Sequence, residues 1–482
     1  MLEEIIAERR KKLEKLKAAG VDPYPATTGK TMPAASVLKD FAKLASSKRK
    51  VSISGRIVAN RDIGNIVFLK VADESGVIQA VLKKDATADF KLWRDTLDRG
   101  DFVKVAGPVF STKTKEKSVE AKTVMMLSKS LRPLPTEHFG LEDEDAKLRE
   151  RYVDLNIDPS VRELFRRKSA FWSSIRDFLR GQDFTEVETG VLEPIPGGAE
   201  AEPFITHHNA LDADFYLRIS LELPLKRLIV GGYERVFEIG RIFRNEGISR
   251  EHLQDYTQME FYWANHDYHD LMVMLPKMYR SAVKAATGGK QETVFQNKTI
   301  KWGGKWPLVD YCVAFKKTNK LDPLTATQEE LFAKAKEVGA EAEKNDGRGR
   351  LIDLIYKKTI RPMLIQPCFL INPPVEIEPL AKRSAKDLRV VERLQIVACG
   401  TELGKGFTEL NDPLDQRARF EEQQKLRDAG DKEAQFLDED FLNALEYGMP
   451  PTAGFGMSER LFAVLMDRPI RECVFFPLMR RK

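Results

Sequence analysis

The chain is organised around Val236-Phe-Glu-Ile-Gly-Arg-Ile-Phe-Arg-Asn-Glu-Gly-Ile-Ser249 and, after a polar loop, Tyr256-Thr-Gln-Met-Glu-Phe-Tyr-Trp263. In the second segment an apolar set and a polar set of side chains alternate; they are Thr257, Met259, Phe261 and Trp263 against Tyr256, Gln258, Glu260 and Tyr262. A period of two is that of a β-strand, so the first set should face a core. The two segments together predict an antiparallel hairpin.

The other face of this hairpin carries charge. In the first segment the odd-numbered residues Phe237, Ile239 and Phe243 point to one face, together with Arg241. The even-numbered Arg244 and Glu246 point to the other face, which they can share with Gln258 and Glu260 of the second segment. The loop over residues 247–255 adds Arg250, Glu251 and His252, which suits closure over an anionic ligand. A solvated hairpin face is the alternative. Tyr256 and Tyr262 beside Glu260 favour a polyanion-binding site, because exposed strands rarely interleave aromatics with lone carboxylates.

Composition limits the class of protein. The 482 residues suggest two to four domains, and 42% hydrophobic residues allow sizeable cores. The net charge of +5 permits a phosphate-bearing partner without demanding one. The four cysteines never form Cys-x-x-Cys, so neither a zinc knuckle nor a disulfide framework is indicated. Such cysteines fit a reducing cytoplasm best, where we expect the protein. No long apolar run occurs, so we expect it to be neither secreted nor membrane-spanning.

The first part of the chain predicts a small barrel. Residues 1–48 should form a basic helix, over 3–18, and a linker; the helix is either solvated or a phosphate-contacting arm. Residues 49–132 contain short strands near 51–58, 66–71, 77–82, 102–107 and 118–127, with a helical segment at 90–97. This order suggests an OB-type barrel. Such barrels bind single-stranded nucleic acid by stacking bases on aromatics, and Phe68, near Arg61 and Gln79, is the candidate. Phe68 could instead be a core residue.

The second part, residues 151–482, follows a linker over 133–150. It opens with a helix at 160–179, for which Ser160 is the expected cap, and a strand at 184–189. Residues 265–365 should be mostly helical and polar, without evident chemistry. Strand patterns return at 388–398 and 405–410, and a glycine-rich strand at 450–458 leads into an apolar helix with Arg460 at the junction. Glycines let a backbone approach a planar ligand, and that arginine can reach phosphate.

These pieces, in this order, resemble a class II aminoacyl-tRNA synthetase, and specifically the class II lysyl-tRNA synthetases, over nearly the whole chain. The runs that carry the resemblance are Gly20-Val-Asp-Pro-Tyr-Pro, Leu131-Arg-Pro-Leu-Pro, Pro203-Phe-Ile-Thr-His-His-Asn-Ala-Leu-Asp, Leu225-Lys-Arg-Leu-Ile-Val-Gly-Gly, Phe243-Arg-Asn-Glu-Gly-Ile-Ser and Thr408-Glu-Leu-Asn-Asp-Pro. The resemblance implies an α+β protein, with an N-terminal OB-type barrel followed by a catalytic domain built on an antiparallel sheet flanked by helices. It also implies a homodimer that makes lysyl-adenylate from lysine and ATP with Mg²⁺ and passes lysine to tRNA(Lys).

The resemblance assigns site residues by position. Those at the reaction centre are Arg244, Glu246 and Arg460. Those of the ATP site are Arg244, Glu246, His252, Tyr256, Gln258 and Arg460, with Tyr256 under the adenine. Those of the lysine site are Gly198, Glu222, Glu260, Tyr262, Phe407 and Glu409. Those of the metal site are Glu402 and Gln395, and those that read the anticodon are Arg61, Phe68 and Gln79. A buried ammonium needs compensating carboxylates, which fits Glu222 and Glu409 facing the ε-ammonium of lysine.

The chain departs from the family pattern at several positions. Gly190 stands where proline is usual, and the family's third motif is one residue short here, with Ser458 where a glycine-rich run is expected. Gln395 replaces a metal-binding carboxylate, Lys405 replaces an asparagine near the substrate, and Thr123 lies where the barrel usually adds a glutamate. An active synthetase is therefore weighed against a catalytically impaired paralogue that acts as an RNA-binding protein. An enzyme that lysylates a protein is a third, weaker reading, because such relatives lack the barrel.

Overall fold

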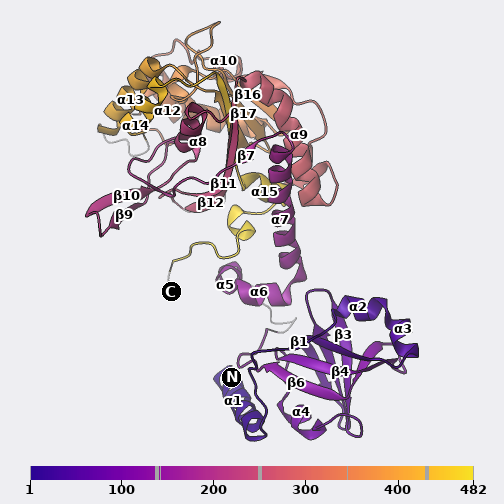
Figure 1. The fold of residues 1–482 in the computed structure, drawn as a ribbon. Helices are drawn as coiled ribbons and strands as arrows, with labels where there is room; N and C mark the ends of the chain where they lie inside the picture. The colour runs from indigo at the N-terminus through magenta and orange to yellow at the C-terminus, as the bar shows by residue number, and fades with distance from the viewer. Residues whose placement is uncertain are drawn as a thin grey trace. The chain divides into compact units, whose positions relative to one another are not determined.

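The computed structural model of the chain describes residues 2–135, 141, 143–247, 252–344, 346–428 and 434–480. It divides into two compact units, Met1–Glu144 and Asp145–Lys482 (Figure 1). The elements of the first unit are α1 (Leu2–Ala18), α2 (Ala34–Lys39), α3 (Phe41–Ser46), β1 (Lys50–Asp62), β2 (Ile66–Ala72), β3 (Val77–Lys83), α4 (Phe90–Thr96), β4 (Phe102–Ser111), β5 (Lys117–Ala121) and β6 (Thr123–Ser128).

The first unit is a β-barrel. Its strands follow the order β1-β2-β3-β5-β4-β6, and β1 pairs with β4 as well as with β2, which closes the sheet on itself. Alternate residues of β1, β2 and β4 point inward, as in Val67, Leu69 and Val71 of β2, which are at most 1% exposed. The single strand expected near residues 118–127 is two strands, because Lys122 separates β5 on β3 from β6 on β4.

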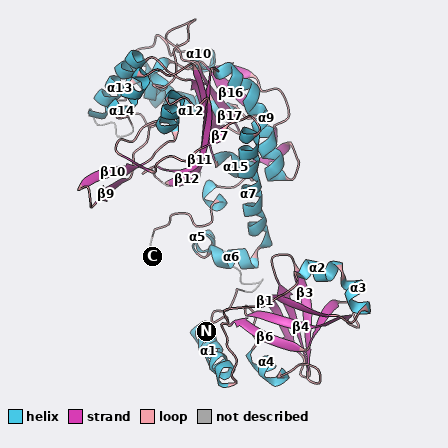
Figure 2. Cartoon of the chain, viewed as in Figure 1, coloured by secondary structure: helices cyan, strands magenta, loops and turns pink. Residues whose placement is uncertain are grey.

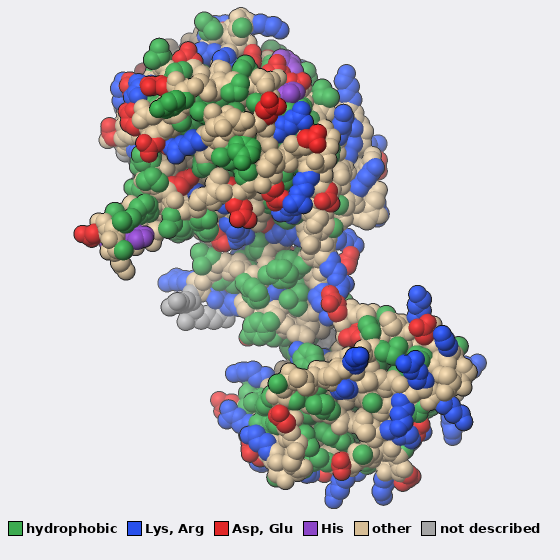
Figure 3. All heavy atoms as spheres, viewed as in Figure 1, with side chains coloured by type: hydrophobic (Ala, Val, Ile, Leu, Met, Phe, Trp, Pro, Cys, Tyr) green, Lys and Arg blue, Asp and Glu red, His purple; other side chains and the backbone are tan. Residues whose placement is uncertain are grey.

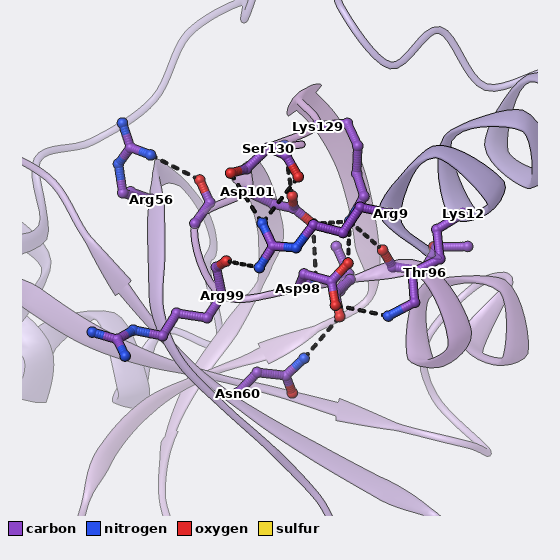
Figure 4. Close-up of polar contacts among 12 residues, drawn as sticks. Arg9, Lys12, Arg56, Asn60, Thr96, Asp98, Arg99, Asp101, Lys129 and Ser130 are labelled. Carbon is purple, nitrogen blue, oxygen red and sulfur yellow. Dashed lines mark hydrogen bonds and ion pairs between the residues drawn. The ribbon is translucent and has the colours of Figure 1, made fainter. Parts of the chain in front are cut away.

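Helix α1 packs on this barrel through some of its basic side chains. The guanidinium of Arg9 is buried and donates to the backbone carbonyls of Ser130 (3.0 Å) and Arg99 (2.9 Å) (Figure 4). The ammonium of Lys12 lies 2.7 Å from Asp98, which also accepts from the fully buried Lys129 at 2.6 Å. Arg9 and Lys12 therefore anchor the helix to the barrel, whereas Arg10, Lys11 and Lys17 are exposed, and a contact of these exposed bases with phosphate stays a prediction.

The second unit is a large mixed sheet covered by helices on both faces (Figure 2). Its helices are α5 (Glu144–Arg149), α6 (Arg151–Ile157), α7 (Pro159–Arg180), α8 (Glu222–Val230), α9 (Tyr268–Thr287), α10 (Tyr311–Asn319), α11 (Gln328–Glu337), α12 (Arg348–Thr359), α13 (Pro413–Asp428), α14 (Glu439–Glu446) and α15 (Arg460–Leu465), with short 3-10 turns at η1 (Arg361–Met363), η2 (Val375–Ile377) and η3 (Ile470–Cys473). Its strands are β7 (Thr185–Glu186), β8 (Leu192–Glu193), β9 (Ile205–His208), β10 (Ala213–Leu217), β11 (Arg235–Phe243), β12 (Asp255–Ala264), β13 (Glu292–Phe295), β14 (Lys298–Lys301), β15 (Leu308–Asp310), β16 (Cys368–Ile371), β17 (Arg393–Ala398), β18 (Thr401–Thr408) and β19 (Thr452–Ser458).

The predicted hairpin is β11 and β12, which pair antiparallel in the sheet β15-β16-β17-β18-β19-β12-β11-β7. Met259 and Phe261 are fully buried in the core beneath α7 and α9, so the apolar face of β12 is confirmed. The opposite face is not uniformly polar as expected. Val236 and Ile242 of β11 enter a second core, which α8 and α14 cover. Both faces of the hairpin therefore pack against a hydrophobic core, and this packing fixes the positions of its polar side chains.

Two local predictions need correction. Helix α7 is capped by Asp158, whose side chain accepts from the Ser160 amide at 2.8 Å, with Pro159 as the first helical residue. Proline suits that position because it lacks the amide that the cap would have to satisfy. The region 265–365 is not polar throughout, because α9 lies in the central core with Leu271 and Met278 fully buried.

Candidate active site

A cavity of about 280 Å³ lies over the polar face of β12 and the neighbouring strands β18 and β19. The structure brings most of the predicted site residues to it: Gly198, Glu222, Arg244, Tyr256, Gln258, Glu260, Tyr262, Glu402, Phe407, Glu409 and Arg460. They come from strands far apart in the sequence, which the sheet order makes neighbours.

One end of the cavity is built from buried carboxylates around an internal ammonium. Glu222 begins α8, and Lys226 follows one turn later with its ammonium 2.6 Å from Glu222. The same ammonium forms an ion pair with Glu409, which follows β18. Lys226 is fully buried, and Glu222 and Glu409 are 6% and 1% exposed. Burial raises the pKa of both carboxyls, although the Lys226 charge opposes that rise.

This end retains capacity for a second cation. The Oε2 of Glu409 contacts the Lys226 ammonium, whereas its Oε1 is buried with no hydrogen-bond partner among the described residues. A side chain at Gly454 would collide with Glu409 and Tyr262, and one at Gly198 would come within 2.8 Å of the Glu222 Cβ. The glycines therefore keep open the space beside the carboxylates. With both carboxyls ionised, the pair and its one internal ammonium carry a net charge of about −1, which a bound ammonium would neutralise and which its charge would in turn favour.

Glu260 is held rigidly beside this pair. Its Oε1 accepts from the Ser220 hydroxyl (2.7 Å) and the Leu221 amide (3.0 Å), and its Oε2 accepts from the Tyr262 hydroxyl (3.0 Å). Burial raises the pKa of Tyr262 well above its usual value, and the surrounding carboxylates add to that rise, so the phenol stays a donor. The orientation of Glu260 is therefore fixed before any ligand arrives.

The other end of the cavity is rich in cations. Arg244 follows β11; its Nε donates to the Ile219 carbonyl at 3.3 Å and its guanidinium carbon lies 5.8 Å from the centre of the Tyr256 ring. Arg460 begins α15, with a long contact of 3.5 Å from its Nη1 to the Glu402 carbonyl. A guanidinium binds phosphate or carboxylate through paired donors, so this end can take an anion.

Glu402 and Gln395 lie next to each other across β17 and β18. The Gln395 amide nitrogen donates to the Glu402 carboxylate, and its oxygen accepts from the Tyr356 hydroxyl at 3.0 Å. Burial alone would raise the pKa of Glu402, but Lys405, Arg393, Arg460 and Lys357 together hold it below its usual value. Glu402 thus lines the cavity as a charged carboxylate, while the Gln395 oxygen is directed to Tyr356.

The remaining predicted residues lie elsewhere. Glu246 and His252 are not among the cavity residues; the Glu246 carbonyl accepts from Gln254 at 3.2 Å, and His252 is exposed. Arg250 and Glu251, which the sequence suggested for the same loop, lie outside the described residues.

The three candidate anticodon residues share the outer face of the barrel. Arg61 pairs with Phe68 across β1 and β2, while Gln79 of β3 pairs with Lys70, on the same face of β2 as Phe68. Phe68 is half-buried between the inward-facing Val67 and Leu69, so it is not a barrel-core residue. Gln79 is buried, and its amide donates to the Ser118 hydroxyl at 2.9 Å. On the side drawn in Figure 3, Lys and Arg side chains stand out around the barrel unit.

Sequence reasoning missed several residues in or directly behind the cavity. Lys226 contacts the cavity residues Glu222 and Glu409 without lining the cavity itself; it lies four residues after Glu222 on α8, a spacing that could have indicated the pair. Lys357 of α12 comes from the region judged to have no chemistry, and Glu378 follows the short turn η2. No sequence signal marks these last two, because only the fold brings them to the cavity.

The chain is similar to known proteins over nearly its whole length. Residues 143–480 match the family described as tRNA synthetases class II (D, K and N), and residues 51–127 match the OB-fold nucleic acid binding domain. Among similar proteins, the lysine–tRNA ligase of Roseiflexus castenholzii is 44% identical over 99% of both chains. That of Moorella thermoacetica is 43% identical over 99% of this chain and 98% of its own, and that of Staphylococcus saprophyticus 41% over 98% of both.

Within the described residues, no helix combines the length and apolar character needed to cross a bilayer. The family match covers more than two thirds of the chain, and the relatives align with it almost end to end. The chain belongs to the class II tRNA synthetases of the D, K and N group.

Proposed function

We propose that this protein ligates L-lysine to tRNA(Lys) through a lysyl-adenylate. The observation that carries the proposal is the buried pair Glu222 and Glu409, which Lys226 compensates only in part. A monocation completes the charge balance there, and a neutral isostere of lysine would leave a carboxylate unpaired. The relatives' names, lysine–tRNA ligase, support the same substrate.

The proposed reaction runs between the two ends of the cavity. The ε-ammonium of lysine lies at Glu222 and Glu409, and its α-ammonium lies near Glu260. A lysine carboxylate oxygen then bonds to the α-phosphorus of ATP, the bond from that phosphorus to the β-phosphate oxygen breaks, and pyrophosphate leaves. Arg244 and Arg460 stabilise the negative charge that builds up on the α-phosphate. In the second step a hydroxyl of the terminal tRNA ribose attacks the lysyl carbonyl carbon, and AMP leaves.

Mg²⁺ is part of the proposal as a partner of the nucleotide. Magnesium is commonly held by one or two carboxylates together with substrate phosphates, and Glu402 offers one charged carboxylate in the cavity. The described residues contain no group of three or more His, Cys, Asp or Glu side chains that could hold a metal by themselves. Glu402 would therefore hold Mg²⁺ together with the ATP phosphates, and the ion would neutralise part of the phosphate charge.

Gln395→Glu should lower the magnesium concentration needed for half-maximal adenylation. The change replaces an amide that donates to Glu402 by a second carboxylate, and two adjacent carboxylates favour a cation between them. Gln366→Glu adds the same charge on an exposed residue and should leave the requirement unchanged. A requirement that stays the same or rises in Gln395→Glu would remove Gln395 from the neighbourhood of the metal.

The barrel is proposed to bind the anticodon, separately from the chemistry. Phe68→Ala should weaken tRNA binding by roughly tenfold or more, because a lost stacking contact costs about 1 to 3 kcal/mol. Lysine-dependent pyrophosphate exchange should stay near wild type, because Phe68 belongs to the other unit. Phe102→Ala is the matched control, since Phe102 is an exposed phenylalanine on β4 of the same barrel. Equal losses in the two variants would argue against stacking on Phe68.

Exchange of labelled pyrophosphate into ATP tests the function itself. The exchange should depend on lysine, with no signal for lysine replaced by norleucine, which lacks the ε-ammonium. A folded protein that binds tRNA but shows no lysine-dependent exchange would support the RNA-binding alternative instead.

We further propose that the protein is a homodimer and that it works in the cytoplasm. Light scattering of the purified protein measures its mass in solution and so tests the homodimer.

A further inference from the structure

Two of the positions where the chain departs from its family are direct neighbours in space. Gln395 of β17 and Lys405 of β18 are register partners in an antiparallel pair. Side chains of such partners lie on the same face of the sheet with their Cβ atoms about 5 Å apart. Relative to the family pattern, residue 395 therefore brings one negative charge fewer and residue 405 one positive charge more to the same part of the sheet.

Gln395 is committed to contacts within the protein. It is 3% exposed, its nitrogen donates to Glu402, and its oxygen accepts from the Tyr356 hydroxyl at 3.0 Å. Tyr356 is itself 1% exposed, so this contact is part of a closed core. In this arrangement Glu402 alone offers a carboxylate on these two strands, which is one negative charge fewer than a pair of carboxylates would bring to a cation.

Lys405 faces the cavity from the same place. Its ammonium lies 2.8 Å from Glu378, which is 4% exposed, whereas the Lys405 side chain is 37% exposed. The described residues that line the whole cavity include six carboxylates and four cations, and the cations are Arg244, Lys357, Lys405 and Arg460. Three of these cations, Lys357, Lys405 and Arg460, act on the single carboxylate of Glu402 and lower its pKa, so positive charge dominates around Glu402 and suits the phosphates of a polyanion.

We infer that Lys405 binds a phosphate oxygen of the nucleotide and supplies a fixed positive charge there, in addition to the Mg²⁺ that Glu402 would hold with the phosphates. The inference rests on the proposed function. A lysine ammonium is a compact point charge that binds phosphate well, and it is covalently present whatever the magnesium concentration. Glu378 holds that ammonium at the cavity wall until the nucleotide arrives. The nucleotide consequently binds with measurable affinity even when no divalent cation is available.

Calorimetry with a non-hydrolysable ATP analogue in excess EDTA tests this assignment without relying on activity. The wild-type protein should bind the metal-free analogue, and Lys405→Met should bind it roughly tenfold or more weakly, as expected for a lost charged hydrogen bond. Lys405→Arg should retain most of the affinity. Lys358→Met, which removes an exposed lysine of α12 that is not a cavity residue, should bind like wild type.

Two results would overturn the inference. One is metal-free binding by Lys405→Met equal to that of wild type. The other is a wild-type protein that binds the analogue with Mg²⁺ but not in EDTA. Failure of the proposed function looks different, because the wild type would then lack lysine-dependent pyrophosphate exchange even with saturating Mg²⁺. A wild type that catalyses exchange while Lys405→Met retains metal-free binding would reject the role of Lys405 alone.

Discussion

Glu409→Gln is expected to weaken lysine binding by about 2 to 5 kcal/mol, which is roughly 30-fold to a few thousand-fold in the dissociation constant. Glu409 is 1% exposed; its Oε2 contacts the Lys226 ammonium, and its Oε1 has no hydrogen-bond partner among the described residues. An amide in its place removes one negative charge from a site that already contains the Lys226 ammonium. A substrate ammonium would then meet a pocket of about zero net charge, so its desolvation would no longer be compensated.

Isothermal titration with lysine measures this loss, and titration with an ATP analogue shows whether the rest of the cavity is intact. Glu376→Gln serves as the matched control, because Glu376 is an exposed glutamate that does not line the cavity. ATP binding should be nearly unchanged in both variants. Unaltered lysine affinity in a folded Glu409→Gln protein would contradict the assignment of Glu409 to the ammonium subsite.

The hairpin and its carboxylates could be predicted from the sequence because their signal is local. A period of two over eight residues separates Met259 and Phe261 from Glu260, and the structure places these residues on opposite faces of β12. The barrel could be predicted for the same reason, since its strands β1, β2 and β4 each carry their own alternation. Phe68, read as either a base-stacking or a core residue, lies outside the core because its neighbours Val67 and Leu69 occupy the inward positions.

Other features depend on contacts between distant segments. The oxygen of Gln395 accepts a hydrogen bond from Tyr356. Tyr356 belongs to the region 265–365, whose polar composition gave no reason to expect a contact near the site. Glu378 and Lys405 meet only because η2 lies beside the sheet. The cap of α7 was predicted wrongly for a local reason. Asp158 and Ser160 are both good capping residues, and Pro159 between them favours Asp158 because proline suits the first helical position.

Lys226→Met is expected to destabilise the second unit by about 3 to 5 kcal/mol at neutral pH. Lys226 is fully buried between Glu222 and Glu409, and methionine keeps much of its volume while removing its charge. Two buried carboxylates would then remain with no internal cation between them. Lys316→Met is the control, because the Lys316 side chain is 66% exposed in its ion pair with Asp322 and should contribute less than about 1 kcal/mol.

The pH dependence of Lys226→Met distinguishes lost charge from lost packing. Burial already raises the pKa of Glu222 and Glu409 in the wild-type protein, and without Lys226 each pKa should rise further. A carboxyl whose pKa is higher folded than unfolded keeps its proton better in the folded state, so its stability cost is largest at high pH and disappears as the pH falls below the unfolded value. The difference in unfolding free energy between wild type and Lys226→Met, measured by urea denaturation, should therefore narrow from about pH 8 to about pH 5.5. A difference that stays constant over this range would mean that Lys226 contributes packing rather than charge balance.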